Sequence, residues 1–225
     1  MADTASAHLR INDGVLAQVE RRTLVWLARR LPESIHSDHL TTLALVGTAI
    51  ASTSFAFARL FPVALVGVGA GLAINWFGDS LDGTVARVRG QERPRYGYYV
   101  DHVLDLVGIA MLMGGIAWSG YMTPLIAMGV LAAYLLVSAE VFLATAVGGA
   151  FRMSFARIGP TELRILLSAG ALALIRWPTC ELQGIGRVLV MDVAGLAVIA
   201  GLLIALSVSA LTMGRALYVA EPRRR

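Results

Sequence analysis

The stretch from Asp79 to Asp105 reads DSLDGTVARVRGQERPRYGYYVDHVLD and joins two long apolar segments through a short polar turn. Asp79 and Asp82 are three residues apart, and Asp101 and Asp105 are four apart, so each pair lies on one face of a helix. Because the connection between the two predicted helices is short, we expect them to be antiparallel neighbours. Their acidic faces are then expected to converge.

Four carboxylates in one pocket repel one another strongly unless cations bind between them. Oxygen ligands suit hard ions such as Mg²⁺, Mn²⁺ or Ca²⁺, and a pair of these ions can clamp a diphosphate. Gly83 and Gly97 leave room for a nucleotide to approach the helix backbone, and Arg87 is suited to contact a phosphate. The alternative is a set of buried ion pairs, although few cationic residues share these faces.

The composition around this stretch is that of a membrane protein. Of the 225 residues, 57% are hydrophobic and 15% are charged, whereas soluble domains carry about 25% charged residues. Lipid is therefore the expected solvent. We predict an all-α integral membrane protein with six transmembrane helices, near residues 39–59, 62–87, 97–119, 122–148, 161–177 and 190–214. The single cysteine, Cys180, excludes an internal disulfide.

An amphipathic helix is predicted ahead of the first span, with arginines on its polar face. Such a helix can lie in the membrane interface, and the alternative is a solvated helix that packs on the domain. We divide the chain into a disordered N-terminus (1–12), this amphipathic juxtamembrane helix (13–31), a six-helix membrane domain (32–216) and a basic C-terminal tail (217–225).

The positions of the arginines predict the orientation of the chain. All 19 basic residues are arginine, and all but Arg59, Arg176 and Arg187 fall on one side of the predicted spans. The positive-inside rule then places both termini and the acidic cluster on the cytoplasmic side. Arginines beside apolar segments favour topology signals or anionic lipid as their role, so no nucleic-acid partner is expected.

The residues of this stretch resemble the signature of the CDP-alcohol phosphotransferase family, D-x2-D-G-x2-A-R followed after a short gap by G-x3-D-x3-D. All eight specified positions are present: Asp79, Asp82, Gly83, Ala86, Arg87, Gly97, Asp101 and Asp105. The resemblance implies a phospholipid-synthesis enzyme that transfers a substituted phosphate group from a CDP-linked donor to an alcohol and releases CMP. It also implies a homodimer in the cytoplasmic (inner or plasma) membrane, with the active site on the cytoplasmic side.

The resemblance further implies a role for each signature residue. Asp79, Asp82 and Asp101 would be the main ligands of a two-metal site for Mg²⁺ or Mn²⁺. Asp105 would complete this site and act as the general base on the incoming hydroxyl. The residues bordering the cytidine diphosphate would be Gly83, Ala86, Arg87 and Gly97.

The identity of the donor stays open at this point. CDP-diacylglycerol would give a phosphatidyl group to a soluble alcohol, whereas CDP-choline or CDP-ethanolamine would give a head group to diacylglycerol. His102, directly after Asp101, resembles the choline/ethanolamine branch, while the compact size of the chain favours the first arrangement. A non-enzymatic transporter or scaffold that binds cations is the competing class, and it would be expected to carry polar groups across the whole bundle.

Four residues outside the eight signature positions are candidates for acceptor binding: Arg152, Arg157, Glu140 and His102. An intramembrane carboxylate such as Glu140 is a functional candidate, but it can equally bond a neighbouring helix. The arginines can serve as a positive-inside loop, and His102 can pack against a neighbour. Near the start of the first span, Asp38 is expected either to cap the helix or to contact the nucleotide.

Overall fold

The computed structural model describes residues 17–148, 160–184 and 186–221, and these residues are mostly helical. Prolines begin several of the helices, since proline at the first position loses no helical hydrogen bond and has a suitable φ. In chain order the elements are α1 (Ala17–Arg30), α2 (Ser37–Ala58), η1 (Pro62–Ala64), α3 (Leu65–Val88), α4 (Pro94–Ser119), α5 (Pro124–Gly148), α6 (Pro160–Leu174), β1 (Thr179–Leu182), β2 (Gly186–Leu189) and α7 (Val190–Ala220).

Five of these segments are long and apolar enough to cross a membrane: Ser37–Ala58, Pro62–Val88, Pro94–Ser119, Pro124–Val147 and Val190–Ala220. The chain is therefore an integral membrane protein with an all-α membrane domain. The predicted segment 161–177 is also helical, but α6 has 15 residues. At about 1.5 Å per residue it is roughly 22 Å long, against about 30 Å for a hydrocarbon core.

The helix ends agree with the predicted spans to within a few residues, except at the C-terminus. There α7 extends to Ala220, past the predicted end at residue 214 and into the segment expected to form the basic tail. The predicted amphipathic helix is present as α1. The predicted disordered segment 1–12 lies outside the described residues.

A two-stranded hairpin between α6 and α7 was absent from the sequence-based expectation. Strands β1 and β2 pair antiparallel, with Thr179 opposite Leu189 and Leu182 opposite Gly186. Gly184 and Gly186 have φ values of 81° and 96°, a left-handed conformation that glycine adopts without strain. Four-residue strands are too short to produce a clear alternating pattern, so the sequence shows only a break at Pro178.

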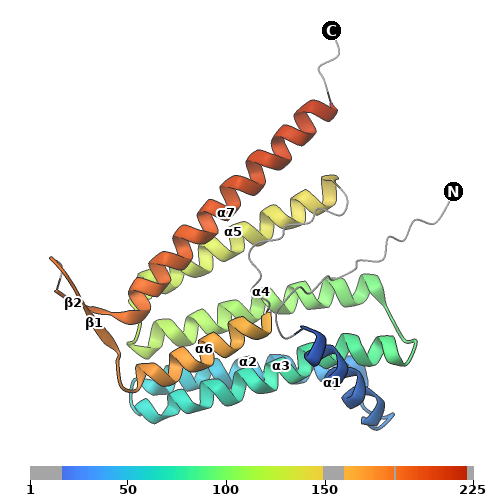
Figure 1. The fold of residues 1–225 in the computed structure, drawn as a ribbon, viewed down its shortest axis with the longest axis horizontal. Helices are drawn as coiled ribbons and strands as arrows, with labels where there is room; N and C mark the ends of the chain where they lie inside the picture. The colour runs from blue at the N-terminus through green and yellow to red at the C-terminus, as the bar shows by residue number, and fades with distance from the viewer. Residues whose placement is uncertain (1–16, 149–159, 185, 222–225) are drawn as a thin grey trace.

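Helix α2 lies between α3 and α4 and packs along both, while α3 and α4 make few contacts with each other (Figure 1). The expectation that the second and third spans are direct neighbours is therefore wrong. Small residues on α2 explain the arrangement: a Cβ added at Gly71 of α3 would lie 2.6 Å from the carbonyl oxygen of Gly47 on α2. On the α4 side, the Ser52 hydroxyl donates to the carbonyl of Met111 at 2.5 Å. Close helix crossings of this kind are typical of membrane bundles.

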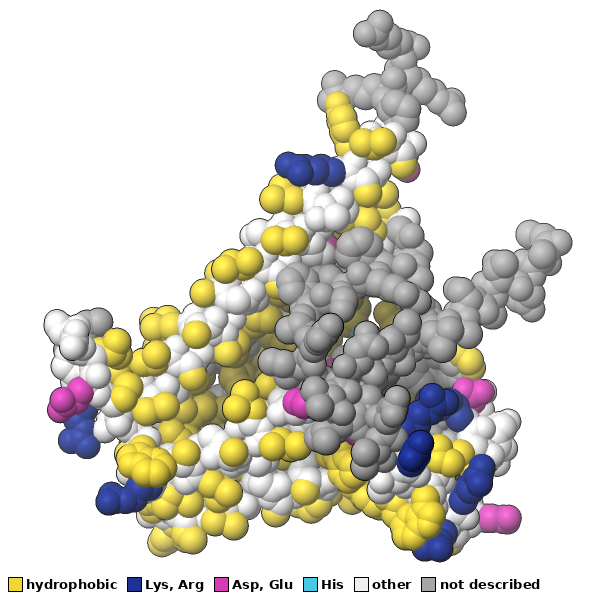
Figure 2. Space-filling model, in the orientation of Figure 1, with side chains coloured by type: hydrophobic (Ala, Val, Ile, Leu, Met, Phe, Trp, Pro, Cys, Tyr) yellow, Lys and Arg dark blue, Asp and Glu magenta, His cyan; other side chains and the backbone are white. Residues whose placement is uncertain are grey.

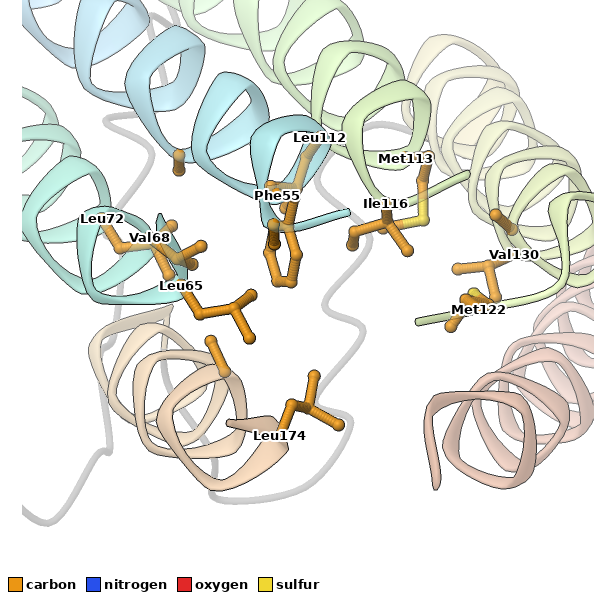
Figure 3. Packing of buried hydrophobic residues seen from close by; sticks show 14 residues of the cluster. Phe55, Leu65, Val68, Leu72, Leu112, Met113, Ile116, Met122, Val130 and Leu174 are labelled. Atoms are coloured by element: carbon orange, nitrogen blue, oxygen red, sulfur yellow. The ribbon is translucent and has the colours of Figure 1, made fainter. Parts of the chain in front are cut away.

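The main apolar core lies at the end of the bundle where α2 finishes and α3 begins. Phe55 of α2, Leu65 and Val68 of α3 and Ile116 of α4 are at most 2% exposed. Figure 3 shows these side chains meeting Leu174 from the end of α6. This core joins five helices, α2 to α6, at the end of the bundle opposite to the signature residues.

Helices α5 and α7 run side by side and lean away from the other helices (Figure 1). At the start of both helices, the backbone and hydroxyl of Thr123 donate to Asp192 at 2.6 Å each. Large apolar side chains on α7, such as Leu196, Ile204 and Leu211, are more than half exposed, and Figure 2 shows hydrophobic side chains spread over this helix. That surface suits contact with lipid.

Candidate active site

Asp82 lies near the C-terminal end of α3 and is held by two hydrogen bonds. The Thr41 hydroxyl on α2 donates to one carboxylate oxygen at 2.7 Å, and the Gly83 N–H donates to the other at 2.5 Å. Thr41 lies on the first turns of α2, so α2 as well as α3 sets the direction of this carboxylate.

Asp79, one turn earlier on α3, forms an ion pair with Arg164 of α6. The guanidinium Nη2 lies 2.7 Å from the carboxylate Oδ2, and the two side chains are 18% and 20% exposed. Because few cationic residues share the faces of the aspartates, few cationic partners were expected for them. For Asp79 that expectation is wrong, because α6 packs on α3 and brings the arginine across.

Asn75 fixes the position of Arg164 from the other side. Its amide oxygen accepts a hydrogen bond from Arg164 Nε at 2.8 Å. Its amide nitrogen donates to the Ala44 carbonyl at 3.1 Å and to the Thr48 hydroxyl at 3.0 Å. A continuous polar chain thus links α2, α3 and α6 and ends on the carboxylate of Asp79.

The other two signature aspartates, Asp101 and Asp105, lie on α4, which packs on α2 as α3 does. The charges of Asp79 and Asp101 are both close enough to act on Asp82. Asp101 and Asp105 in turn lie within electrostatic reach of Tyr134 on α5. Three of the four signature carboxylates therefore share one region, and Asp105 extends it toward α5.

The donor chemistry of this region fits a hard divalent cation, because all four candidate ligands are carboxylates. The spacing is wider than a closed metal site. Among the residues that the structure describes, no three acidic, histidine or cysteine side chains lie close enough together to hold a metal ion. With Asp79 on Arg164 and Asp82 on Thr41, cation binding here would require the carboxylates to move toward one another.

The glycines of the signature have different surroundings. A Cβ added at Gly83 would lie 3.3 Å from the Arg87 guanidinium, which also donates to the Thr84 hydroxyl at 3.1 Å. Glycine at 83 thus allows the arginine to fold over the helix. A Cβ at Gly97 would meet nothing within 4 Å. The space beside Gly97 is open, as a site for an approaching ligand requires.

A cavity of ≈ 540 Å³ opens beside Ala86, between the start of α2 and the α3–α4 connection. At its rim Asp38 and Arg93 form an ion pair with a 2.5 Å separation. Asp38 lies inside the first turn of α2, whose N-cap is His36, so the expectation that Asp38 caps this helix is wrong. The Asp38 carboxylate instead pairs with Arg93 in the connection between α3 and α4.

Two of the acceptor-binding candidates are engaged with neighbouring helices. The Nδ1–H of His102 donates to the Tyr98 carbonyl oxygen at 2.8 Å, and its ring packs edge-on against Phe142 of α5. Both carboxylate oxygens of Glu140 lie 2.8 Å from the Ser209 hydroxyl on α7. These contacts support the packing alternatives for both residues. Arg152 and Arg157 lie outside the described residues.

Sequence reasoning missed Thr41, Asn75 and Arg164 as parts of this site. A polar side chain within an apolar span was the available signal for Asn75. Arg164 carried a similar signal, since it stands on a predicted span rather than in the loop before it. Neither signal names a partner, because the contacts join residues far apart in the chain.

Two comparisons with known proteins bear on this arrangement. No curated protein matches the chain. The profile of the CDP-alcohol phosphatidyltransferases matches residues 35–212, which spans α2 to α7 and includes every signature aspartate. Members of that family are membrane phosphotransferases of phospholipid synthesis, generally dependent on a divalent metal, that use a CDP-alcohol donor and an alcohol acceptor. On the length of this match and the intact signature, the chain belongs to the CDP-alcohol phosphatidyltransferase family.

Proposed function

We propose that this protein transfers a substituted phosphate group from a CDP-linked donor to an alcohol and releases CMP, with Asp105 as the general base. The observation that carries the proposal is the family match over residues 35–212, which includes all eight signature residues, with Asp79 and Asp82 on successive turns near the end of α3. A transporter would need polar groups across the whole bundle, whereas the opposite end is an apolar core.

In the proposed reaction, the hydroxyl oxygen of the acceptor attacks the donor phosphorus on the side away from CMP. A new P–O bond forms, the P–O bond to CMP breaks, and the hydroxyl proton passes to the Asp105 carboxylate. Asp105 is exposed. A general base must be accessible in this way, because the alcohol reaches it from the membrane or from solution. Both CDP-diacylglycerol and a CDP-linked head group remain candidate donors.

The remaining signature residues bind and orient in this proposal. Asp79, Asp82, Asp101 and Asp105 would hold Mg²⁺ or Mn²⁺, which supplies positive charge against the diphosphate. Arg87, folded over Gly83, is suited to meet a phosphate oxygen. Gly83, Ala86 and Gly97 border the nucleotide, and the cavity beside Ala86 and the open space at Gly97 support this part of the proposal.

The test is CMP release by the purified protein with Mg²⁺ or Mn²⁺ from CDP-diacylglycerol, CDP-choline and CDP-ethanolamine, each paired with a panel of acceptors. Asp105→Asn is expected to lower the rate by about 10²–10⁴-fold, the usual contribution of a general base. Asp192→Asn removes a carboxylate at the far end of the bundle and serves as the matched control. Full activity of Asp105→Asn would disprove the base assignment, and failure of all three donors would disprove the transferase.

We also propose six crossings, with both termini in the cytoplasm and α1 in the membrane interface. The contacts of α6 support a sixth crossing despite its length. At its start Thr161 donates to Glu20 of α1 at 2.7 Å, and at its end Leu174 joins the apolar core with Phe55. Helix α6 thus extends from the level of Glu20 to the apolar core at the opposite end of the bundle, which supports a crossing.

The single cysteine gives a direct test of this topology. Cys180 lies on β1, so six crossings put it on the side opposite the termini. In intact cells a membrane-impermeant maleimide should label Cys180. A cysteine introduced by Arg95→Cys in a Cys180→Ala background should react only after permeabilisation. Labelling of both sites from the same side would rule out the six-crossing arrangement. The homodimer implied by the family resemblance stays a prediction.

A further inference from the structure

Helix α1 uses its apolar side to dock on the end of α3. Leu24 and Ala28 are 8% and 2% exposed and pack in one cluster with Leu81 and Val85. Polar contacts add to this docking, since Glu20 accepts a hydrogen bond from the Trp76 indole at 2.8 Å. The apolar residues that an interfacial helix would otherwise insert into lipid are therefore occupied within the protein.

The opposite side of α1 carries a concentrated positive charge. Four arginine side chains, together with Val25 and Trp26, line one open cavity of ≈ 690 Å³ along this side of α1: Arg21, Arg22, Arg29 and Arg30. Within the described part of the chain, no carboxylate lies within ion-pair distance of any of the four. The Arg30 guanidinium lies 3.8 Å from the centre of the Trp26 ring, and Trp26 is 51% exposed.

This surface is held at the end of a membrane span. The Arg89 guanidinium, just past α3, donates to the carbonyl oxygens of Ile35 at 2.6 Å and of Leu31 and Pro32 at 3.0 Å each. These bonds tie the end of α1 to the end of α3. Figure 2 shows basic side chains gathered at this end of the molecule. The end of a span lies at the depth of the lipid head groups.

We propose that the cavity formed by Arg21, Arg22, Arg29 and Arg30 binds the phosphate of an anionic phospholipid head group. A guanidinium group can bind two phosphate oxygens at once, so a neighbouring pair, Arg21 with Arg22 or Arg29 with Arg30, provides enough donors for one phosphate. Trp26 and Val25 add an apolar contact beside the charges, which a lipid uses and a free phosphate ion does not. Tryptophan is itself typical of this depth in the membrane.

The binding is separate from the proposed transfer reaction, because the cavity contains none of the signature residues. Its role would be to hold α1 against the anionic leaflet, so that the α2 and α3 ends packed on it stay at the membrane surface. The attraction is electrostatic and should weaken as ionic strength rises.

The test uses the full-length protein in uncharged maltoside micelles, titrated calorimetrically with dioctanoyl phosphatidylglycerol, dioctanoyl phosphatidylcholine and inorganic phosphate. A variant carrying Arg21→Gln, Arg22→Gln, Arg29→Gln and Arg30→Gln is compared with a control variant in which four exposed arginines elsewhere, Arg59, Arg176, Arg187 and Arg215, are changed to Gln. We expect phosphatidylglycerol to bind at least about tenfold more weakly to the first variant than to the control. The difference between the two variants reports on this cavity alone.

Three outcomes would overturn the inference. They are equal phosphatidylglycerol affinity in the two variants, equal affinity of the wild type for phosphatidylcholine, and equal affinity for inorganic phosphate. The last would assign the cavity to a soluble anion. Glutamine is a good helix former, so α1 should persist in the variant. If circular dichroism shows otherwise, the pair Arg21→Gln and Arg22→Gln replaces it, with a smaller but measurable loss expected. CMP release is measured separately, so a failure of lipid binding can be distinguished from a failure of the proposed transferase activity.

Discussion

The two halves of α3 differ in what holds them. In the first half Leu65 and Val68 are completely buried among apolar side chains from α2, α4 and α6. In the second half Asp79 and Asp82 are each held by one polar side chain from another helix, Arg164 and Thr41. The first half needs only volume and shape from its neighbours. The second needs specific donors, so single substitutions there should alter chemistry as well as stability.

Breaking the Arg164–Asp79 pair is expected to have the largest effect. Arg164→Gln leaves a carboxylate that is four-fifths buried without its counter-charge, at a cost of about 3 kcal/mol, the lower end for a buried pair. Thermal unfolding in detergent measures this. The double variant Arg164→Gln with Asp79→Asn removes the orphaned charge, so it should regain part of the stability while CMP release stays low.

The matched control for this prediction is the other ion pair of the described residues, Arg93 with Asp38, whose side chains are about half exposed. Arg93→Gln should leave the unfolding temperature unchanged, because solvent screens exposed pairs. If Arg93→Gln and Arg164→Gln lower the unfolding temperature equally, burial does not make the Arg164–Asp79 pair more important for stability than the Arg93–Asp38 pair.

The close α2–α3 crossing offers the next largest effect. In Gly71→Ala the new Cβ would lie 2.5 Å from the Ala51 nitrogen and 2.6 Å from the Gly47 oxygen, so the helices must separate. We expect a loss of about 1–3 kcal/mol, as for other overpacked sites. Gly114→Ala on α4 meets nothing within 4 Å and should be neutral or slightly stabilising. Equal unfolding temperatures for the two variants would contradict the close crossing.

The smallest expected effect comes from Thr41→Val, which keeps the shape of the side chain and removes one donor to Asp82. The lost hydrogen bond should cost about 1 kcal/mol, and CMP release should require more divalent cation if Asp82 is a ligand. Thr42→Val is the control, since among the described residues the Thr42 hydroxyl bonds the Asp38 carbonyl in its own helix and no signature residue. A cation requirement that rises equally in both variants would remove the special role of Thr41.

Much of the fold could be predicted because it depends on local patterns. Length and apolarity locate each membrane helix, and the 3.6-residue period places Asp79 and Asp82, or Asp101 and Asp105, on one face. The hairpin at 179–189 was not predicted, since four-residue strands carry little periodic signal. The position of α2 between α3 and α4 was not predicted either, because the short α3–α4 connection favoured direct packing of those two helices.

The sequence by itself determined a membrane protein, its helices and an intact signature, because hydrophobic length and helical spacing are properties of consecutive residues. Only the tertiary structure decided that α2 separates the two acidic helices and that Arg164 pairs with Asp79, 85 positions away along the chain. It also decided that the arginines of α1 face outward while Leu24 and Ala28 face α3. Such choices depend on how small residues let helices approach, and therefore on surfaces that are far apart in the sequence.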